Sequence, residues 1–160
     1  MGGAINVPGN TSPTSEFNIF ADPYAAQHVY DEAERNSFKF VLVPLDITSL
    51  HIIPFNRMIG TVNAPPNSIP DTTVSIEASK DIPNFLEALL GRPRKTLHDL
   101  GLPDAMEMHD PLAAWYAICA ALPSNPGLGW LVYKKKFAIE RTGEHTRGMC
   151  VVDRRYDSIG

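Results

Sequence analysis

The chain has 160 residues, of which 44% are hydrophobic and 20% are charged. This length and composition suit one folded domain with its own core, and they exclude an intrinsically disordered chain. The formal net charge is -4 and no segment is strongly basic, which argues against nucleic acid as a partner. No apolar run approaches the ~20 residues that a membrane-spanning helix needs, and the N-terminus lacks a secretory signal pattern. Cys119 and Cys150 lack metal-ligand spacing, so we expect reduced, buried thiols in a cytoplasmic protein.

The N-terminal quarter of the chain is predicted to form a loop, a helix and a strand. Residues 1–20 are rich in Gly, Pro, Asn, Ser and Thr, which is typical of a loop. Asp22 can then cap a helix, and Pro23 suits the first helical turn. The following run Phe38–Val43 consists mainly of aromatic and β-branched residues. It predicts a buried strand.

The middle of the chain contains a predicted surface loop and two helices. Residues 63–67 (Asn-Ala-Pro-Pro-Asn) are expected to form the loop, and Asp81 is expected to cap a short helix that ends near Gly91. The segment Pro111–Leu122 contains no charged residue. A surface helix would carry a polar stripe, so this helix is expected to be buried on most sides. Whatever sits at its N-terminus should then be held rigidly.

The C-terminal part predicts an antiparallel hairpin. Two apolar runs, Phe137–Glu140 and Met149–Val152, flank a Thr-Gly-Glu-His turn region. Helices and strands alternate earlier in the chain. The order of elements therefore favours an α/β fold, with an open, mostly parallel sheet, flanking helices and a late antiparallel hairpin.

The first candidate for chemistry is His109-Asp110-Pro111, directly before the apolar helix. A histidine there could act as a general acid near neutral pH, and an aspartate could provide a hard oxygen ligand for calcium. The alternative is that Asp110 is only an N-cap followed by proline, with an incidental histidine. Asp22-Pro23 has that same cap pattern without a neighbouring histidine, so the residues alone leave both interpretations open.

The second candidate is the loop that contains Asn10 and Glu16-Phe17-Asn18. Two amides and a carboxylate around one aromatic ring could recognise several hydroxyl groups of a sugar. The alternative is ordinary turn chemistry, because Asn and Ser side chains often satisfy loop backbones. Taken alone, this pattern does not distinguish the two.

Taken together, these segments resemble one enzyme family. The string MGGA, then GN, then EFNIFADPYAA is similar to the sugar-binding segment of the inosine–uridine-preferring nucleoside hydrolases. Val41–Thr48 resembles the family's LDVT strand, His109–Pro111 its HDP helix start, and Glu144–Asp153 its T-R-G hairpin. The resemblance covers nearly the whole chain in the family's order. Fungal-type and other uridine-preferring members look closest, although the sequence does not fix purine or pyrimidine preference.

The resemblance implies hydrolysis of the N-glycosidic bond of ribonucleosides to ribose and a free base. It implies that His109 donates a proton to the departing base, and that Asp110 ligates Ca²⁺ and touches the ribose. The residues that match the family's ribose-binding positions are Met1, Asn10, Glu16, Phe17 and Asn18. Asp46 is expected to be structural. Complete members of the family are expected to form homo-oligomers.

The family's aspartate-rich signature, DTDPG-x-DD, does not occur in this sequence. We therefore expect residues 1–160 to form a partial nucleoside hydrolase domain, truncated at both ends and lacking its N-terminal half. One carboxylate cannot supply the six to eight oxygens of a calcium site, so weak calcium binding and little hydrolysis are expected of this chain alone. Exposed apolar surface is expected as well. The alternative function is a catalytically inactive fragment that binds nucleoside or ribose, or that associates with another chain.

Overall fold

The computed structural model describes residues 1–59, 81–121 and 129–155, which fall into two compact units. One unit is built from Met1–His51 and Met108–Gly160, and the other from Ile52–Glu107. The expected loop at 63–67 lies outside the described residues. No described helix is long and apolar enough to cross a membrane.

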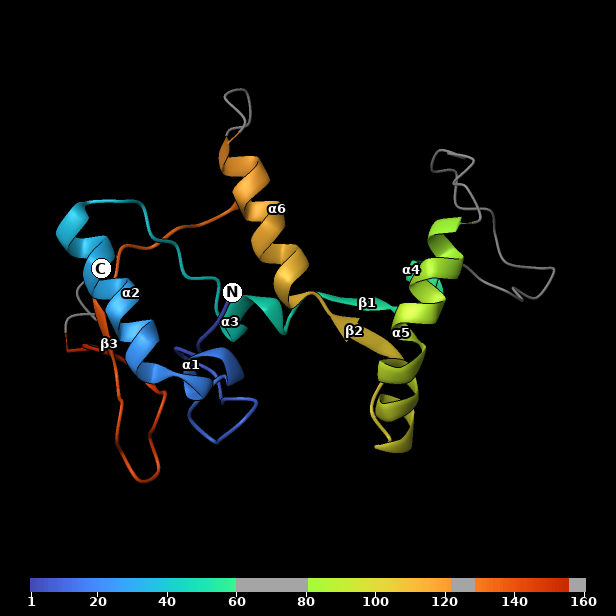
Figure 1. Ribbon diagram of the computed structural model, residues 1–160, viewed down its shortest axis with the longest axis horizontal. Coiled ribbons are helices and arrows are strands. Elements are labelled where there is room, and N and C mark those ends of the chain that lie inside the picture. Colours follow the sequence, from blue (N-terminus) through green and yellow to red (C-terminus); the bar gives the residue numbers. More distant parts are fainter. Residues whose placement is uncertain (60–80, 122–128, 156–160) are drawn as a thin grey trace. The chain divides into compact units, whose positions relative to one another are not determined.

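Helices dominate the first unit (Figure 1). Its elements are α1 (Phe17–Ala21), α2 (Pro23–Asn36), α3 (Leu45–Thr48), α6 (His109–Ala121), β3 (Phe137–Ile139) and β4 (Cys150–Val152). The second unit contains β1 (Ile52–Pro54), α4 (Phe55–Ile59), α5 (Asp81–Asp99) and β2 (Ala105–Glu107). Among the described residues, the strands form a pair of two-stranded antiparallel sheets, β1 with β2 and β3 with β4.

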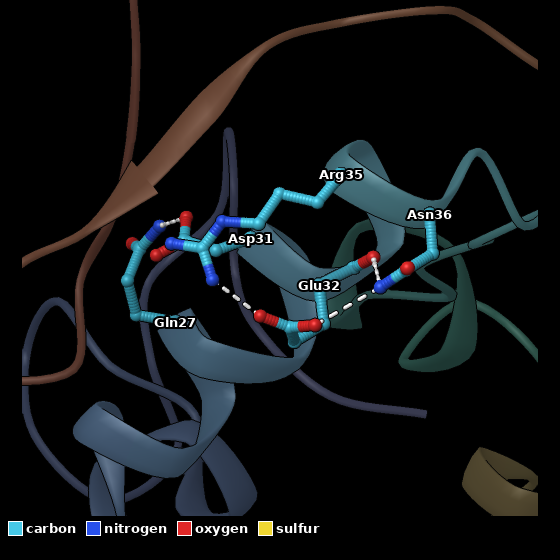
Figure 2. Close-up of polar contacts among 5 residues, drawn as sticks. All are labelled: Gln27, Asp31, Glu32, Arg35 and Asn36. Carbon is cyan, nitrogen blue, oxygen red and sulfur yellow. Dashed lines mark hydrogen bonds and ion pairs between the residues drawn. The ribbon is translucent and has the colours of Figure 1, made fainter.

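The predicted start of α2 is confirmed. The Asp22 carboxylate accepts a hydrogen bond from the Ala25 amide at 2.9 Å, and Pro23 occupies the first turn. Gln27 joins this helix to the hairpin, because its side-chain oxygen accepts the Ile139 amide at 2.6 Å. Figure 2 shows the polar surface of α2, where Gln27 donates to Asp31 at 2.7 Å and Glu32 accepts from Arg35 and Asn36.

The late hairpin is also confirmed, with Ala138 opposite Val151 in the antiparallel register. Its turn packs on the end of α1. The Arg147 guanidinium donates to the Phe20 carbonyl at 3.3 Å, and it thereby binds a carbonyl that the short helix leaves unpaired. Gly148 follows with φ +78° and donates its amide to the Glu140 carbonyl at 2.7 Å. Local turn geometry therefore attaches the hairpin to the N-terminal segment.

The core of this unit lies between α1 and the hairpin. Ile19, Ile139 and Cys150 form its buried cluster. Both cysteines are free and buried, as the sequence predicted. Burial raises the pKa of the Cys150 thiol to about 11, so this thiol stays protonated and uncharged at neutral pH.

Two carboxylates hold the first residues of the chain in place. Glu16, which is only 2% exposed, accepts the Gly3 amide at 2.8 Å and the Asn18 amide at 2.9 Å. Asp46 accepts the amides of Ile5 at 2.8 Å and Asn6 at 2.7 Å. The expectation that Asp46 is structural is confirmed. Charge-assisted bonds of this kind are roughly twice as strong as neutral ones, which suits a segment without secondary structure of its own.

The predicted strands at Phe38–Val43 and Val41–Thr48 are wrong. Residues 38–44 form no strand, and Leu45–Thr48 is the short helix α3. The physical reason lies at Pro44, which has no amide to donate to a ladder, and whose carbonyl instead accepts the Thr48 amide at 3.2 Å. Two isolated backbone bonds, Gly2 to Val43 and Leu45 to Gly3, join this segment to the N-terminus. The expected mostly parallel sheet is thus not found among the described residues.

The helix that begins at Asp81 does not end near Gly91, as predicted, but continues as α5 to Asp99. Gly91 lies within it, with Pro93 following. The helix terminates only where Gly101 adopts φ +68° and donates its amide to the His98 carbonyl. A left-handed glycine just past a helix is a common way to end it. Gly101, and not Gly91 as the sequence predicted, is the glycine at which this helix ends.

The expectation that the apolar helix is buried on most sides is wrong for the described residues. Cys119 is its buried member, whereas Trp115 is 50% and Ile118 is 54% exposed. An all-apolar helix becomes buried only where other elements cover it, and the described residues leave these side chains uncovered. The separate expectation of exposed apolar surface is confirmed here.

Replacing Gly148 by Ala should destabilise the protein. The left-handed φ costs a side chain about 1 kcal/mol or more, and the added carbon would lie 2.8 Å from the Phe20 Cα. Gly101→Ala is the matched control, because Gly101 has φ +68° but open space around it. Denaturant unfolding should show a loss for Gly148→Ala that exceeds the control by roughly 1–3 kcal/mol. Equal losses would show that the contact with Phe20 is unimportant.

Replacing Glu16 by Gln should also lower the free energy of unfolding. An amide offers one acceptor oxygen in place of two, so a buried backbone N–H loses its partner, at a cost of about 1–3 kcal/mol. Glu144→Gln is the control, since the Glu144 side chain is 88% exposed; its effect should stay within about 0.5 kcal/mol. Denaturant midpoints measure both. A Glu16→Gln protein as stable as the control would contradict a structural role for this carboxylate.

Candidate functional site

The structure brings the five candidate sugar-binding residues together at the start of α1. The Asn10 side-chain oxygen accepts the Phe17 amide at 2.9 Å, which closes the loop onto the helix. The Asn18 amide group approaches both the Met1 carbonyl, at 3.5 Å, and the Met1 sulfur, at 3.6 Å. Glu16 lies beneath them and caps the helix through the amides of Asn18 and Ile19. One short helix therefore orders residues that are far apart in the N-terminal loop.

These residues differ in how they meet solvent. Asn10 and Asn18 are exposed, and the Phe17 ring is 61% exposed, whereas Glu16 is buried. The Asn10 oxygen already accepts a backbone amide, which leaves its NH₂ group to donate to a ligand. Exposed amide groups around a rigid turn can donate to and accept from the hydroxyls of a sugar. Glu16 is placed to hold that turn rather than to meet a ligand with its full charge.

The second candidate lies at the N-terminus of α6. His109 begins this helix, and its Nδ1 lies 2.8 Å from the Thr48 hydroxyl. Asp110 is exposed and lies in the first turn, and the residue before the helix is Met108, so the alternative in which Asp110 is the N-cap is wrong. The carboxylate of Asp110 is nevertheless favoured in the first turn, because the N-terminal end of a helix carries partial positive charge.

Hydrogen bonds connect the two candidates within the same unit. Glu16 holds the Gly3 amide, and the Gly3 carbonyl accepts the Leu45 amide at 2.9 Å. Leu45 begins α3, which ends at Thr48, the partner of His109. Figure 1 shows α3 beside the start of α6, and the two helices are in contact. The sugar-binding candidates and the histidine therefore belong to one bonded framework.

A calcium site is not built by the described residues alone. Among them, no group of three His, Cys, Asp or Glu side chains could hold a metal ion. Calcium takes six to eight oxygen ligands, and Asp110 can supply one carboxylate. The donor set present in this part of the chain thus does not fit calcium without ligands from elsewhere.

The sequence interpretation missed the contributions of Gly3 and Thr48. Gly3 has φ +79°, and a side chain there would lie 3.0 Å from the Cys150 sulfur, so this position favours glycine. Thr48 is fully buried, at 0% exposure. Its position in the family-like string Val41–Thr48 was a signal, but the residues alone did not indicate a partner 61 positions later.

The chain matches the family model described as inosine-uridine preferring nucleoside hydrolase over residues 1–158. It is 30% identical to the non-specific ribonucleoside hydrolase RihC of Salmonella schwarzengrund, over 96% of this chain and 40% of that protein. An uncharacterized protein of Schizosaccharomyces pombe, C1683.06c, is 40% identical over 96% of this chain and 41% of its own length.

A solved plant nucleoside hydrolase, PpNRh1, matches with a TM-score of 0.68 and 18% identity. The alignment covers 99% of this chain and 42% of the plant protein, and it shows that the two share an α/β fold. The chain thus spans about two fifths of the length of the relatives that it matches. On these matches, together with the HDP helix start and the ordered N-terminal loop, the chain belongs to the inosine-uridine preferring nucleoside hydrolase family.

Proposed function

We propose that this chain supplies the ribose-binding segment and the proton donor of an enzyme that hydrolyses the N-glycosidic bond of ribonucleosides of the inosine or uridine type. The observation that carries the proposal is the hydrogen-bonded framework that joins the Asn10–Asn18 loop to His109. The family match supports the reaction class. The relatives' names support a ribonucleoside substrate, which gives ribose and a free base.

Ribose recognition is assigned to the turn at the start of α1. The exposed amide groups of Asn10 and Asn18 are suited to bind sugar hydroxyls, and both are fixed by contacts to Phe17 and Met1. Glu16 Oε2 accepts the amides of Gly3 and Ile19, whereas Oε1 accepts only the Asn18 amide and keeps a second lone pair that a hydroxyl could approach. A preordered turn lowers the entropy cost of binding a small polar ligand.

Proton donation is assigned to His109. As the bond between C1′ and the base nitrogen breaks, the ribose develops oxocarbenium character and negative charge grows on the base. A protonated imidazole can deliver its proton to the departing base nitrogen. The attacking water would then bond to C1′ through its oxygen and give up one proton to a carboxylate of the family's aspartate-rich motif, which this sequence does not contain. General acid catalysis of this kind contributes about 10²–10⁴-fold.

Calcium is the metal that we propose for the complete site, with Asp110 as one of its ligands. Bound calcium would hold the ribose hydroxyls and polarise the attacking water. The remaining ligands would come from outside the described donor set, as the family's aspartate-rich motif implies. Weak binding of calcium by this chain alone is the expected consequence.

The second candidate function is a non-catalytic fragment that binds ribose or nucleoside or that associates with another chain. The exposed apolar side chains of α6, Trp115 and Ile118, favour it. Large exposed apolar side chains on one helix are typical of a surface that another polypeptide covers. Ribose binding without turnover would be consistent with this candidate.

The test compares this chain with a fusion in which an N-terminal segment carrying the aspartate-rich motif, taken from a full-length relative, precedes Met1. The chain alone should bind calcium weakly in calorimetric titrations and release little ribose from inosine or uridine. The fusion should hydrolyse them in a calcium-dependent manner. In the fusion, His109→Ala should slow inosine hydrolysis by about 10²–10⁴-fold. It should slow p-nitrophenyl riboside much less, because that leaving group needs no proton.

His145→Ala is the matched control, since the His145 side chain is 87% exposed and should not affect either substrate. Equal slowing of both substrates by His109→Ala would contradict the proton-donor role. A fusion that binds ribose but shows no turnover would favour the second candidate. Family-like turnover by the unfused chain would contradict the expectation that it needs further ligands.

A further inference from the structure

The environment of His109 differs from those of His51, His98 and His145. Its Nδ1 contacts the hydroxyl of Thr48, a side chain with 0% exposure, at 2.8 Å. His51 contacts a backbone carbonyl through its Nδ1. His98 and His145 approach exposed carboxylates at 3.6 and 3.8 Å, and their own side chains are 88% and 87% exposed. A fully buried hydroxyl is a fixed partner, whereas an exposed carboxylate on a flexible stem is not.

Backbone hydrogen bonds hold the two partners at this distance. The Thr48 carbonyl accepts the His51 amide at 3.1 Å, and the His51 carbonyl accepts the Met108 amide at 2.8 Å. Met108 is 9% exposed and immediately precedes His109. The side-chain bond between His109 and Thr48 completes a ring of hydrogen bonds whose other two members are these backbone bonds. Such a closed ring leaves the imidazole little freedom to rotate away from the hydroxyl.

The polarity of this bond follows from the proposed role of His109. An imidazolium donates from both ring nitrogens, so the hydroxyl facing Nδ1 must accept when the ring is ready to give up a proton. The proton that is transferred must then leave from Nε2. A hydroxyl also orients the ring without adding a charge beside it, unlike a carboxylate in the same place.

We propose that Thr48 is a positioning residue for His109: its hydroxyl accepts a hydrogen bond from Nδ1–H and thereby directs Nε2–H toward the leaving base. This inference rests on the proposed function for the direction of proton transfer. The orientation of the ring can be tested without any enzymatic activity. The side chain that orients a histidine decides which nitrogen carries the exchangeable proton.

The first experiment measures the tautomer of His109 in this chain, by long-range proton–nitrogen NMR spectra of the imidazoles at neutral pH. The spectrum of His109→Gln assigns the signals. In the wild-type chain the neutral His109 ring should be protonated at Nδ1. Thr48→Val, which is nearly isosteric but has no hydroxyl, should shift the His109 signals toward a mixture of tautomers. Thr48→Ser should restore the wild-type pattern.

Thr96→Val is the control, because it removes a threonine hydroxyl that donates to the Arg92 carbonyl at 3.1 Å instead of facing a histidine ring. It should leave the His109 signals unchanged. An Nε2-protonated neutral ring in the wild-type chain would overturn the proposal. So would a Thr48→Val spectrum identical to wild type. If Thr48→Val does not fold, the wild-type tautomer and the Thr48→Ser spectrum still decide the question.

The second experiment uses the active fusion. Thr48→Val should lower kcat for inosine by up to about 100-fold while KM stays nearly constant, because a misplaced proton donor affects the transition state more than binding. Hydrolysis of p-nitrophenyl riboside should change little, and Thr48→Ser should recover most of the lost rate. If His109→Ala shows no dependence on the leaving group, the proposed function itself fails. If His109→Ala shows it and Thr48→Val does not, the proposed function stands and the role of Thr48 is refuted.

Discussion

The buried carboxylate of Glu16 is the interaction on which the rest of the first unit depends. A charged group at 2% exposure is costly unless its oxygens are satisfied, and here backbone amides from both sides satisfy them. One side is the helix α1, whose start it caps. The other is Gly3 in the N-terminal segment. The same bonds that offset the cost of burial therefore place Met1 beside Asn18.

The framework continues from that carboxylate to the candidate acid. Gly3 holds Leu45, α3 carries the chain to Thr48, and the Thr48 hydroxyl meets His109. Almost every hydrogen bond in this framework has a backbone group as donor or acceptor. Exposed side chains can therefore bind a ligand while the main chain stays ordered. This division suits a site on loops, where binding groups gather but the backbone needs support from elsewhere.

The sequence predicted what depends on neighbouring residues, and it failed where distant residues decide. Asp22 caps α2 and the T-R-G hairpin forms, because capping and turn chemistry act within a few positions. The segment Val41–Thr48 was expected to be a strand because it resembles the family's LDVT strand. Pro44 instead precedes the short helix Leu45–Thr48, whose first residue is bonded to the N-terminal segment. Glu16 was predicted as a sugar ligand, and this role stays a prediction. Its role as a backbone anchor became visible only once Gly3 lay beside it.

The apolar helix α6 shows that the sequence pointed to the wrong support for His109. The absence of charge from Pro111 onward suggested that burial of the helix would hold His109 rigidly. Trp115 and Ile118 are instead half exposed, so burial of α6 does not supply that rigidity. The hydrogen bonds of Met108 and Thr48 at its first turn do. These bonds join the first turn of α6 to Thr48 and His51, whereas Trp115 and Ile118 lie further along the helix, so the orientation of the histidine rests on other residues than the apolar face.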